Sequence, residues 1–258
     1  MSLKIGLFDS GIGGLTVLTQ LVKYMPDAEY FYVADTLNAP FGTRTQDQIL
    51  VISLRVLDFL KRSGVDCIVT ACNTADASIR SAKVQTQIPY FGILDFEISA
   101  DLQKVAVIAT KFTVQNGIYG RILKSKGAKE VLEIPCQSLV KIVEEGLIDS
   151  SQADQEIENC MGILRNSGTS TLVFGCTHFP FLAHKIRAHF PELILFDPAQ
   201  SVAEKVWRTL MKTNRGNGKV NFFVTSDPSS FSNKILKYQR LFDLPFTVEL
   251  IDLGDPIR

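Results

Sequence analysis

Two cysteines of this chain stand in matching local settings. Cys72 lies within Ile-Val-Thr-Ala-Cys-Asn-Thr at residues 68–74, and Cys176 lies within Leu-Val-Phe-Gly-Cys-Thr-His at residues 172–178. Each thiol comes just past a short apolar run and before residues that form hydrogen bonds. Such surroundings can hold a thiol near its thiolate form, which is the reactive form. The matched settings in the two halves favour a function for this pair over inert burial.

The other cysteines show no such pattern. The chain has five cysteines in 258 residues, without a Cys-x-x-Cys pair and without histidines at zinc-ligand spacing. We therefore expect neither a disulfide framework nor a structural metal site. Free cysteines are usually buried as small apolar side chains. Three cysteines fit that role: Cys67, Cys136 and Cys160.

An acidic, glycine-rich loop follows the first apolar run. It reads Asp9-Ser10-Gly-Ile-Gly-Gly, so its N–H groups and the Ser10 hydroxyl could surround an anion. The loop has neither the spacing of a dinucleotide-binding motif nor the lysine of a nucleotide phosphate loop. Its glycines alone are equally compatible with a tight turn. The carboxylate of Asp9 favours an ammonium ligand or proton chemistry instead.

Further candidates follow other apolar runs. His178 lies two residues after Cys176, where it could be an acid–base group, a partner of the thiolate or an ordinary loop histidine. Asp35 and the pair Phe41-Gly42 follow another apolar run. These three residues could line the same crevice as the cysteines, or they could belong to a turn.

The elements that would position these residues alternate between short β-branched runs and segments with helical periodicity. This alternation predicts an α/β fold with mainly parallel sheets. The clearest helix spans residues 46–62 and ends before Gly64. Strands are expected at residues 4–8, 30–34, 67–70, 90–93, 104–109, 130–134, 171–174, 193–196, 220–225 and 247–251. Because ligands bind outside the carboxyl ends of such strands, both cysteine motifs lie at functional edges.

The order of strand, turn and helix recurs in the two halves of the chain. Residues 4–10 are echoed by residues 104–110, where Thr110 stands in the place of Ser10. We expect two pseudo-symmetric lobes with the active site in the cleft between them. Residues 213–218 are the best linker by composition, and a helix is expected from 229 to about 242. The first lobe would comprise residues 1–95 plus 208–258, and the second lobe residues 96–207.

Composition limits the classes of partner. The chain is 46% hydrophobic and 21% charged, with 27 basic and 27 acidic residues. A net charge of zero without a basic run offers no footprint for nucleic acid or for an anionic membrane. The first apolar run is broken at Asp9, before it could form a signal peptide core. We therefore expect a cytoplasmic protein that meets any partner through a local site.

Several short motifs occur along nearly the whole chain in one order. They are Asp9-Ser10-Gly11-x-Gly13-Gly14, Ala34-Asp35-Thr36 with Pro40-Phe41-Gly42, Ala71-Cys72-Asn73-Thr74-Ala75, Glu144-Glu145-Gly146 and Gly175-Cys176-Thr177-His178-Phe179-Pro180. In order and approximate spacing this set resembles the glutamate racemases. The resemblance implies a cofactor-independent enzyme that interconverts L- and D-glutamate and supplies D-glutamate for peptidoglycan synthesis. It also implies two α/β lobes that enclose this small-molecule substrate, with a homodimer as a possible assembly.

The resemblance also implies roles for individual residues. Cys72 and Cys176 would be the two acid–base groups, assisted by Asp9 and His178, with no metal and no cofactor. Asp35 and Glu145 would contribute near the site. Residues that would hold the amino acid are Asp9, Ser10, Phe41, Gly42, Asn73, Thr74, Thr177 and His178.

This chemistry is consistent with the residue types. Inversion of a stereocentre by proton transfer requires a base on one face of Cα and an acid on the other. Two thiols can do both jobs and exchange them with the direction of reaction. No lysine or arginine occurs in the matching motifs, so N–H and hydroxyl groups would have to meet the carboxylates.

Two positions depart from the family pattern. Phe41 stands where the family usually has tyrosine, and the segment 93–97 lacks a proline that often occurs there. These departures concern substrate preference more than reaction type. The alternatives are a racemase for aspartate or another amino acid and a non-catalytic protein that keeps the cleft for a ligand. A related decarboxylase with one cysteine is disfavoured because both thiols are present.

Overall fold

The computed structural model describes residues 2–210 and 216–257. The described strands form two separate sheets in which all paired strands are parallel. The first sheet has the order β10-β9-β2-β1-β3-β4, with strands at Phe246–Leu250, Lys219–Val224, Glu29–Ala34, Lys4–Asp9, Cys67–Thr70 and Tyr90–Gly92. The second sheet has the order β6-β5-β7-β8, with strands at Glu130–Pro135, Lys104–Ala109, Thr171–Gly175 and Ile194–Phe196. The strands expected from the sequence agree with these bounds to within one residue.

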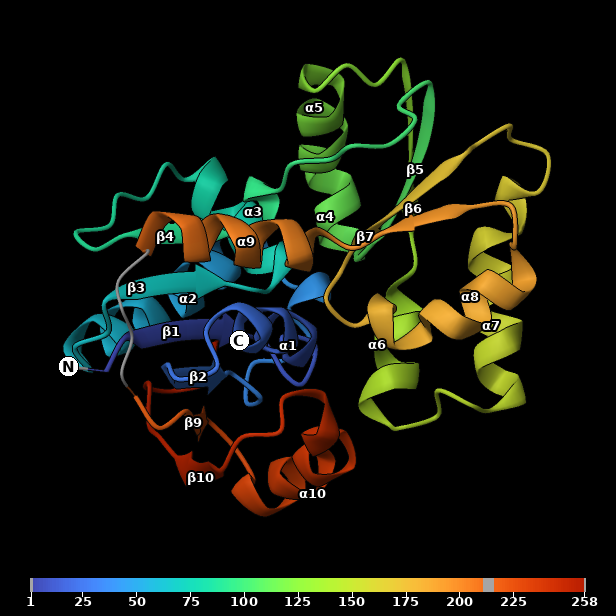
Figure 1. The fold of residues 1–258 in the computed structure, drawn as a ribbon. Helices are drawn as coiled ribbons and strands as arrows, with labels where there is room; N and C mark the ends of the chain where they lie inside the picture. The colour runs from blue at the N-terminus through green and yellow to red at the C-terminus, as the bar shows by residue number, and fades with distance from the viewer. Residues whose placement is uncertain (1, 211–215, 258) are drawn as a thin grey trace.

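The two sheets share one strand order. The order β6-β5-β7-β8 in the second sheet repeats β2-β1-β3-β4 in the first, and each sheet lies in its own lobe (Figure 1). Phe8 of β1 pairs with Thr70 of β3, and Ala109 of β5 pairs with Gly175 of β7. The α/β fold with two pseudo-symmetric lobes is therefore confirmed. Since all strands are parallel, the segments after β1 and β3, and after β5 and β7, leave their sheets at the carboxyl edges.

Helices and short 3₁₀ turns connect these strands. The helices are α1 (Leu15–Tyr24), α2 (Gln46–Arg62), α3 (Asn73–Ser81), α4 (Lys111–Asn116), α5 (Ile118–Ser125), α6 (Gln137–Glu144), α7 (Ser151–Met161), α8 (Ala183–His189), α9 (Pro198–Leu210) and α10 (Pro228–Tyr238). The 3₁₀ turns are η1 (Phe41–Thr43), η2 (Ile93–Asp95), η3 (Gly162–Leu164), η4 (Phe179–Leu182) and η5 (Gln239–Leu241). The helix expected from residue 229 to 242 is thus α10 followed by η5.

Helix α2 shows how local sequence sets the bounds of an element. Thr45 accepts a hydrogen bond from the N–H of Gln48, whose side chain accepts one from the N–H of Thr45, so the N-terminus is closed by a capping box. One face of the helix is buried against the first sheet. Gly64 adopts a φ of +69° just after the last turn, a conformation that favours glycine. These signals account for the agreement of α2 with the expected helix.

The C-terminal segment belongs to the first sheet. β9 pairs with β2, β10 pairs with β9, and α10 lies beside them at the lower edge of this lobe (Figure 1). The described chain enters this segment from α9, which packs on α1 with Trp207 stacked on Tyr24. The expected boundary between residues 207 and 208 falls within α9. Of the expected linker at residues 213–218, positions 213–215 lie outside the described residues.

A disulfide corrects one expectation from the sequence. Cys136 and Cys160 are bonded to each other, with their Cα atoms 5.7 Å apart and 24 positions apart in the sequence. Helices α6 and α7 pack against each other, and this packing brings together two thiols that share no sequence motif. The bond joins the residue that precedes α6 to the last turn of α7. The three cysteines that remain free are Cys67, Cys72 and Cys176.

Across the described residues, no helix combines the length and the apolar character needed to cross a membrane.

Candidate active site

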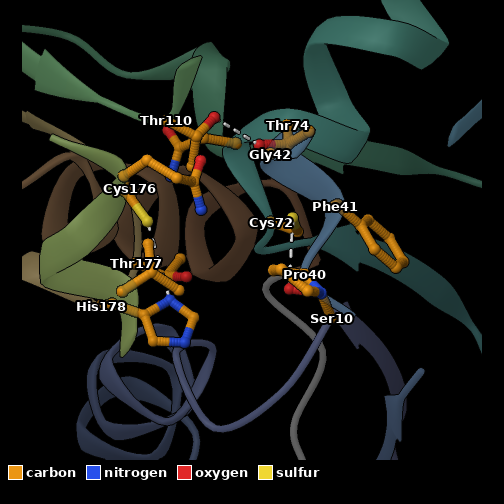
Figure 2. Close-up of a pocket in the computed structure, with 13 residues that line it drawn as sticks. Ser10, Pro40, Phe41, Gly42, Cys72, Thr74, Thr110, Cys176, Thr177 and His178 are labelled. Carbon is orange, nitrogen blue, oxygen red and sulfur yellow. Dashed lines mark hydrogen bonds between the residues drawn. The ribbon is translucent and has the colours of Figure 1, made fainter. Parts of the chain in front are cut away.

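A small pocket lies where the carboxyl edges of the two sheets meet. Figure 2 shows Cys72 and Cys176 on opposite sides of this space. Cys72 follows β3 and Cys176 follows β7, so each lobe contributes one thiol from the equivalent strand. The residues that line the pocket are Ser10, Pro40, Phe41, Gly42, Cys72, Asn73, Thr74, Thr110, Gln137, Val140, Cys176, Thr177 and His178.

Cys72 lies directly before α3 in the first lobe. Its side chain is 6% exposed, and its Sγ is 3.9 Å from the Ser10 hydroxyl (Figure 2). Burial raises the pKa of the Cys72 thiol, and the neighbouring carboxylate of Asp9 raises it further. These surroundings favour the protonated thiol, which can donate a proton.

Cys176 has a different partner. Its Sγ lies 3.6 Å from Nδ1 of His178, and both side chains are buried. Burial by itself would lower the pKa of His178, but hydrogen bonds to Cys176 and Glu144 outweigh it and raise the pKa well above its ordinary value. An imidazolium beside a thiol stabilises the thiolate. The two thiols therefore differ in their surroundings, although their places in the fold are equivalent.

Glu144, at the end of α6, completes the Cys176 side of the site. Its Oε1 accepts hydrogen bonds from Nε2 of His178 at 2.9 Å and from the N–H of Ile12 at 3.2 Å. Burial would raise the pKa of Glu144, but the hydrogen bonds from His178 and Lys234 lower it to about 2. The resemblance had directed attention to Glu145 instead. Glu145 is exposed and faces Lys141 on the surface, so the structure assigns the contact with His178 to Glu144.

Asp9 lies at the end of β1 and is fully buried. Its Oδ1 accepts the N–H of Gly11 at 3.0 Å, and its Oδ2 accepts the hydroxyl of Thr177 from the other lobe at 3.1 Å. Burial raises the pKa of Asp9, while the charge of His178 and these hydrogen bonds oppose the rise. Asp9 thus connects the glycine-rich loop of the first lobe to the Cys176 segment of the second.

Threonines connect the lobes on the opposite side of the pocket. Thr74 Oγ1 lies 2.9 Å from Oγ1 of Thr110, which follows β5 (Figure 2). Asn73 accepts a hydrogen bond from the hydroxyl of Tyr119 in the second lobe. The sequence repeat aligns Thr110 with Ser10, and this signal would have identified Thr110 as a pocket residue, although it was not among the expected site residues.

The segment at residues 40–42 lines one part of the pocket. The ring of Phe41 points away from the two thiols (Figure 2) and packs on Phe8, with ring centroids 6.0 Å apart. Phe41 lines the pocket without a hydroxyl, so any contact that a tyrosine oxygen would make here is absent. A Cβ at Gly42 would collide with Thr110 and with the side chain of Gln137, so the close approach of the lobes requires glycine here.

One residue that was expected at the site lies outside the pocket, and two residues that were not expected line it. Asp35 is buried, but its carboxylate accepts hydrogen bonds from Asn38 and from Thr225, and it does not line the pocket. Its contacts hold a loop to the end of β9. Gln137 and Val140 of α6 do line the pocket. Their sequence shows no signal for this, because only the packing of α6 directs them there.

The lining contains no lysine or arginine among the described residues. Anionic groups of a ligand would therefore meet hydroxyl, amide and backbone N–H donors. No group of three or more metal-binding side chains occurs within residues 2–210 and 216–257.

A family model supports this description. The model for Asp/Glu/hydantoin racemases matches residues 13–206, which is more than half of the chain. The chain belongs to this racemase family. Both cysteine motifs lie inside the matched region.

Relatives and solved structures of the family cover nearly the whole chain. A glutamate racemase of Carboxydothermus hydrogenoformans is 32% identical over 240 residues, which cover 90% of each chain. The structure of the glutamate racemase of Francisella tularensis in complex with D-glutamate superposes with a TM-score of 0.88 at 26% identity, covering 98% of each chain. The structure of the glutamate racemase of Thermus thermophilus in complex with β-chloro-D-alanine superposes with a TM-score of 0.82 at 31% identity, also covering 98% of each chain.

Proposed function

We propose that this racemase acts on glutamate and inverts its Cα by proton transfer between two thiols. The observation that carries the proposal is the placement of Cys72 and Cys176 on opposite sides of one pocket, at equivalent strand ends of the two lobes. Relatives of similar length at about 32% identity, such as the one from Carboxydothermus hydrogenoformans, are glutamate racemases, which supports glutamate as the substrate. The chemistry needs no pyridoxal phosphate and no metal, because side chains supply both the acid and the base.

The surroundings of the thiols suggest how the protons move. Cys176, beside the imidazolium of His178, is suited to remove the Cα proton from one face. Cys72, held as a thiol by burial and by Asp9, is suited to give a proton to the other face. In the reverse direction the two thiols exchange roles. The carbanion and the carboxylates would be stabilised by the N–H and hydroxyl groups that line the pocket, including Ser10.

Deuterium labelling tests this proton pathway. When L-glutamate is incubated in deuterium oxide and sampled at low conversion, the D-product should carry deuterium at Cα, because its proton comes from a thiol equilibrated with solvent. The remaining L-substrate should stay mostly unlabelled. Similar labelling of both pools, or poor labelling of the product, would indicate a single base and refute the two-thiol assignment.

Cysteine variants provide a second test with a matched control. Cys72→Ala and Cys176→Ala should each abolish racemisation in both directions, because each direction needs one thiolate and one opposing thiol. Cys67→Ala removes a free, buried thiol outside the pocket, one whose pKa burial raises to about 12, and it should affect stability only. Near-normal turnover of either pocket variant would overturn the assignment.

Simple assays distinguish the proposed glutamate racemase from the alternative functions. Comparison of kcat/KM for glutamate, aspartate and other amino acids distinguishes a glutamate racemase from its relatives. Absence of all turnover would favour a binding protein that keeps the cleft. Turnover after dialysis against a chelator and a carbonyl reagent tests independence from cofactors. A cytoplasmic location, a homodimer and the supply of D-glutamate for peptidoglycan complete the proposal.

A further inference from the structure

Lys234 of α10 forms an ion pair across the two lobes beside the pocket. Its Nζ lies 2.7 Å from Oε2 of Glu144, and the side chains are 36% and 28% exposed. Helix α10 belongs to the C-terminal segment of the first lobe, whereas Glu144 ends α6 in the second. Both residues line a wider cavity that adjoins the pocket and shares Ser10 and Gln137 with it.

The two oxygens of Glu144 have separate partners. Oε2 accepts from Lys234, while Oε1 accepts from Nε2 of His178 and from the N–H of Ile12. The opposite nitrogen of His178 lies 3.6 Å from Sγ of Cys176. An unbroken series of contacts therefore runs from Lys234 at the edge of the cavity to one of the two proposed acid–base groups.

We propose that Lys234 is a positioning residue that orients Glu144 and limits its stabilisation of the His178 imidazolium. This inference rests on the proposed proton chemistry of Cys176. With Lys234 in place, one carboxylate is shared between two cations, so less of its negative charge acts on His178. A histidine that is protonated too firmly would leave Cys176 a weak base and would hinder return of the proton to the thiol.

The sign of the effect follows from charge alone. Removal of Lys234 takes a positive charge from the vicinity of His178 and leaves the charge of Glu144 unshared, so the pKa of His178 rises. The pKa of Glu144 rises as well, because it loses one of its two cationic partners, but from about 2 it leaves the group ionised near neutral pH.

Other charged and titratable groups lie on the elements packed around this series and are unchanged by the substitution. They are Asp9 of β1, Tyr32 of β2, Cys72 before α3, Lys141 and Glu145 of α6 and its C-terminus, Asp149 before α7, and Lys237 and Tyr238 of α10.

The test compares Lys234→Gln, which removes the charge, with Lys234→Arg, which keeps it. Lys237→Gln is the matched control, because Lys237 is an exposed lysine on the same helix, three residues further on. Lys234→Gln should lower kcat about 10-fold with KM changed by less than about twofold, while Lys234→Arg and Lys237→Gln should stay near wild type. A large rise in KM at unchanged kcat would mean that the Lys234–Glu144 ion pair only holds the two lobes together, and it would overturn the proposal.

A titration of His178 by nitrogen-15 NMR gives a readout that needs no turnover. The chain has three histidines, so His184→Gln and His189→Gln assign the signals. Lys234→Gln should raise the pKa of His178 by about 0.5 to 1 unit. In a Glu144→Gln background the same substitution should raise this pKa by less, because only the direct charge of Lys234 is then removed. An unchanged pKa of His178 would refute the inference, whereas failure of the wild type to racemise glutamate would count against the proposed function and leave this titration interpretable.

Discussion

Gly13 lies where the glycine-rich loop touches the Cys176 segment, and Gly13→Ala should damage activity far more than folding. A Cβ at this position would lie 2.6 Å from Nδ1 of His178 and even closer to Oγ1 of Thr177. Ordinary contacts of a Cβ begin at about 3.4 Å, so the imidazole must move by about 0.8 Å, the difference between 3.4 and 2.6 Å. This displacement disturbs the contact between His178 and Cys176.

The magnitudes follow from that displacement. A misplacement of about 1 Å at a reacting group costs about 100-fold in rate, and overpacking costs about 1 to 3 kcal/mol in the free energy of unfolding. We therefore expect kcat to fall by about 100-fold while the variant remains folded. Initial rates of L-glutamate racemisation and urea unfolding curves measure the two effects.

A second glycine provides the control. Gly162→Ala adds the same methyl group where the nearest atom is the flexible end of Glu158 at 3.4 Å, outside the pocket. It should leave kcat within about twofold of wild type. If Gly13→Ala retained a kcat within about threefold of wild type, close contact between the glycine-rich loop and His178 would be irrelevant to turnover, and the geometric reasoning would be wrong.

Three further predictions concern other parts of the molecule. Cys136→Ser should lower the free energy of unfolding by about 3.5 kcal/mol, because the bond to Cys160 closes a loop of about 25 residues. Urea unfolding with and without reductant measures this loss, and a loss below about 1 kcal/mol would contradict the prediction. The pKa of Glu144 is lowered to about 2 from 4.5, so its contribution to stability is complete above pH 4.5 and is lost as the pH falls towards 2. Wild type should therefore lose about 2 kcal/mol more than Glu144→Gln between about pH 5.5 and 3 in urea unfolding, and equal losses would argue against the depressed pKa. Asp9→Asn keeps an acceptor for the N–H of Gly11 but removes a buried charge, so kcat should fall by a factor of about 10² to 10⁴, and a kcat within threefold of wild type would limit Asp9 to a structural role.

Local sequence was sufficient to predict the strands, the parallel α/β class and two cysteines at equivalent strand ends, which the structure brings to one pocket. Apolar runs of four to six residues and helical periodicity are properties of neighbouring residues, and they set β3, β7 and α2 with bounds close to those observed. The parallel arrangement then placed Cys72 and Cys176 at carboxyl edges. The repeat between the halves identified their equivalence before any contact was known.

Only the tertiary structure decided which of two adjacent acids meets His178. Successive residues of a helix differ in direction by about 100°, so Glu144 at the end of α6 reaches His178 while the exposed Glu145 pairs with Lys141. The motif Glu-Glu-Gly contains both residues and cannot choose between them. The choice depends on how α6 packs against the Cys176 segment.

Two further contacts join residues that are distant in the chain, one beside the site and one away from it. Lys234 meets Glu144 across 90 positions, and Cys136 meets Cys160 across 24. Neither pair has a spacing that local sequence rules can recognise, because the distance between the partners is set by the packing of helices from different parts of the chain. The sequence thus determined the elements and the chemical types at their ends, while packing between the lobes decided which of those groups act on one another.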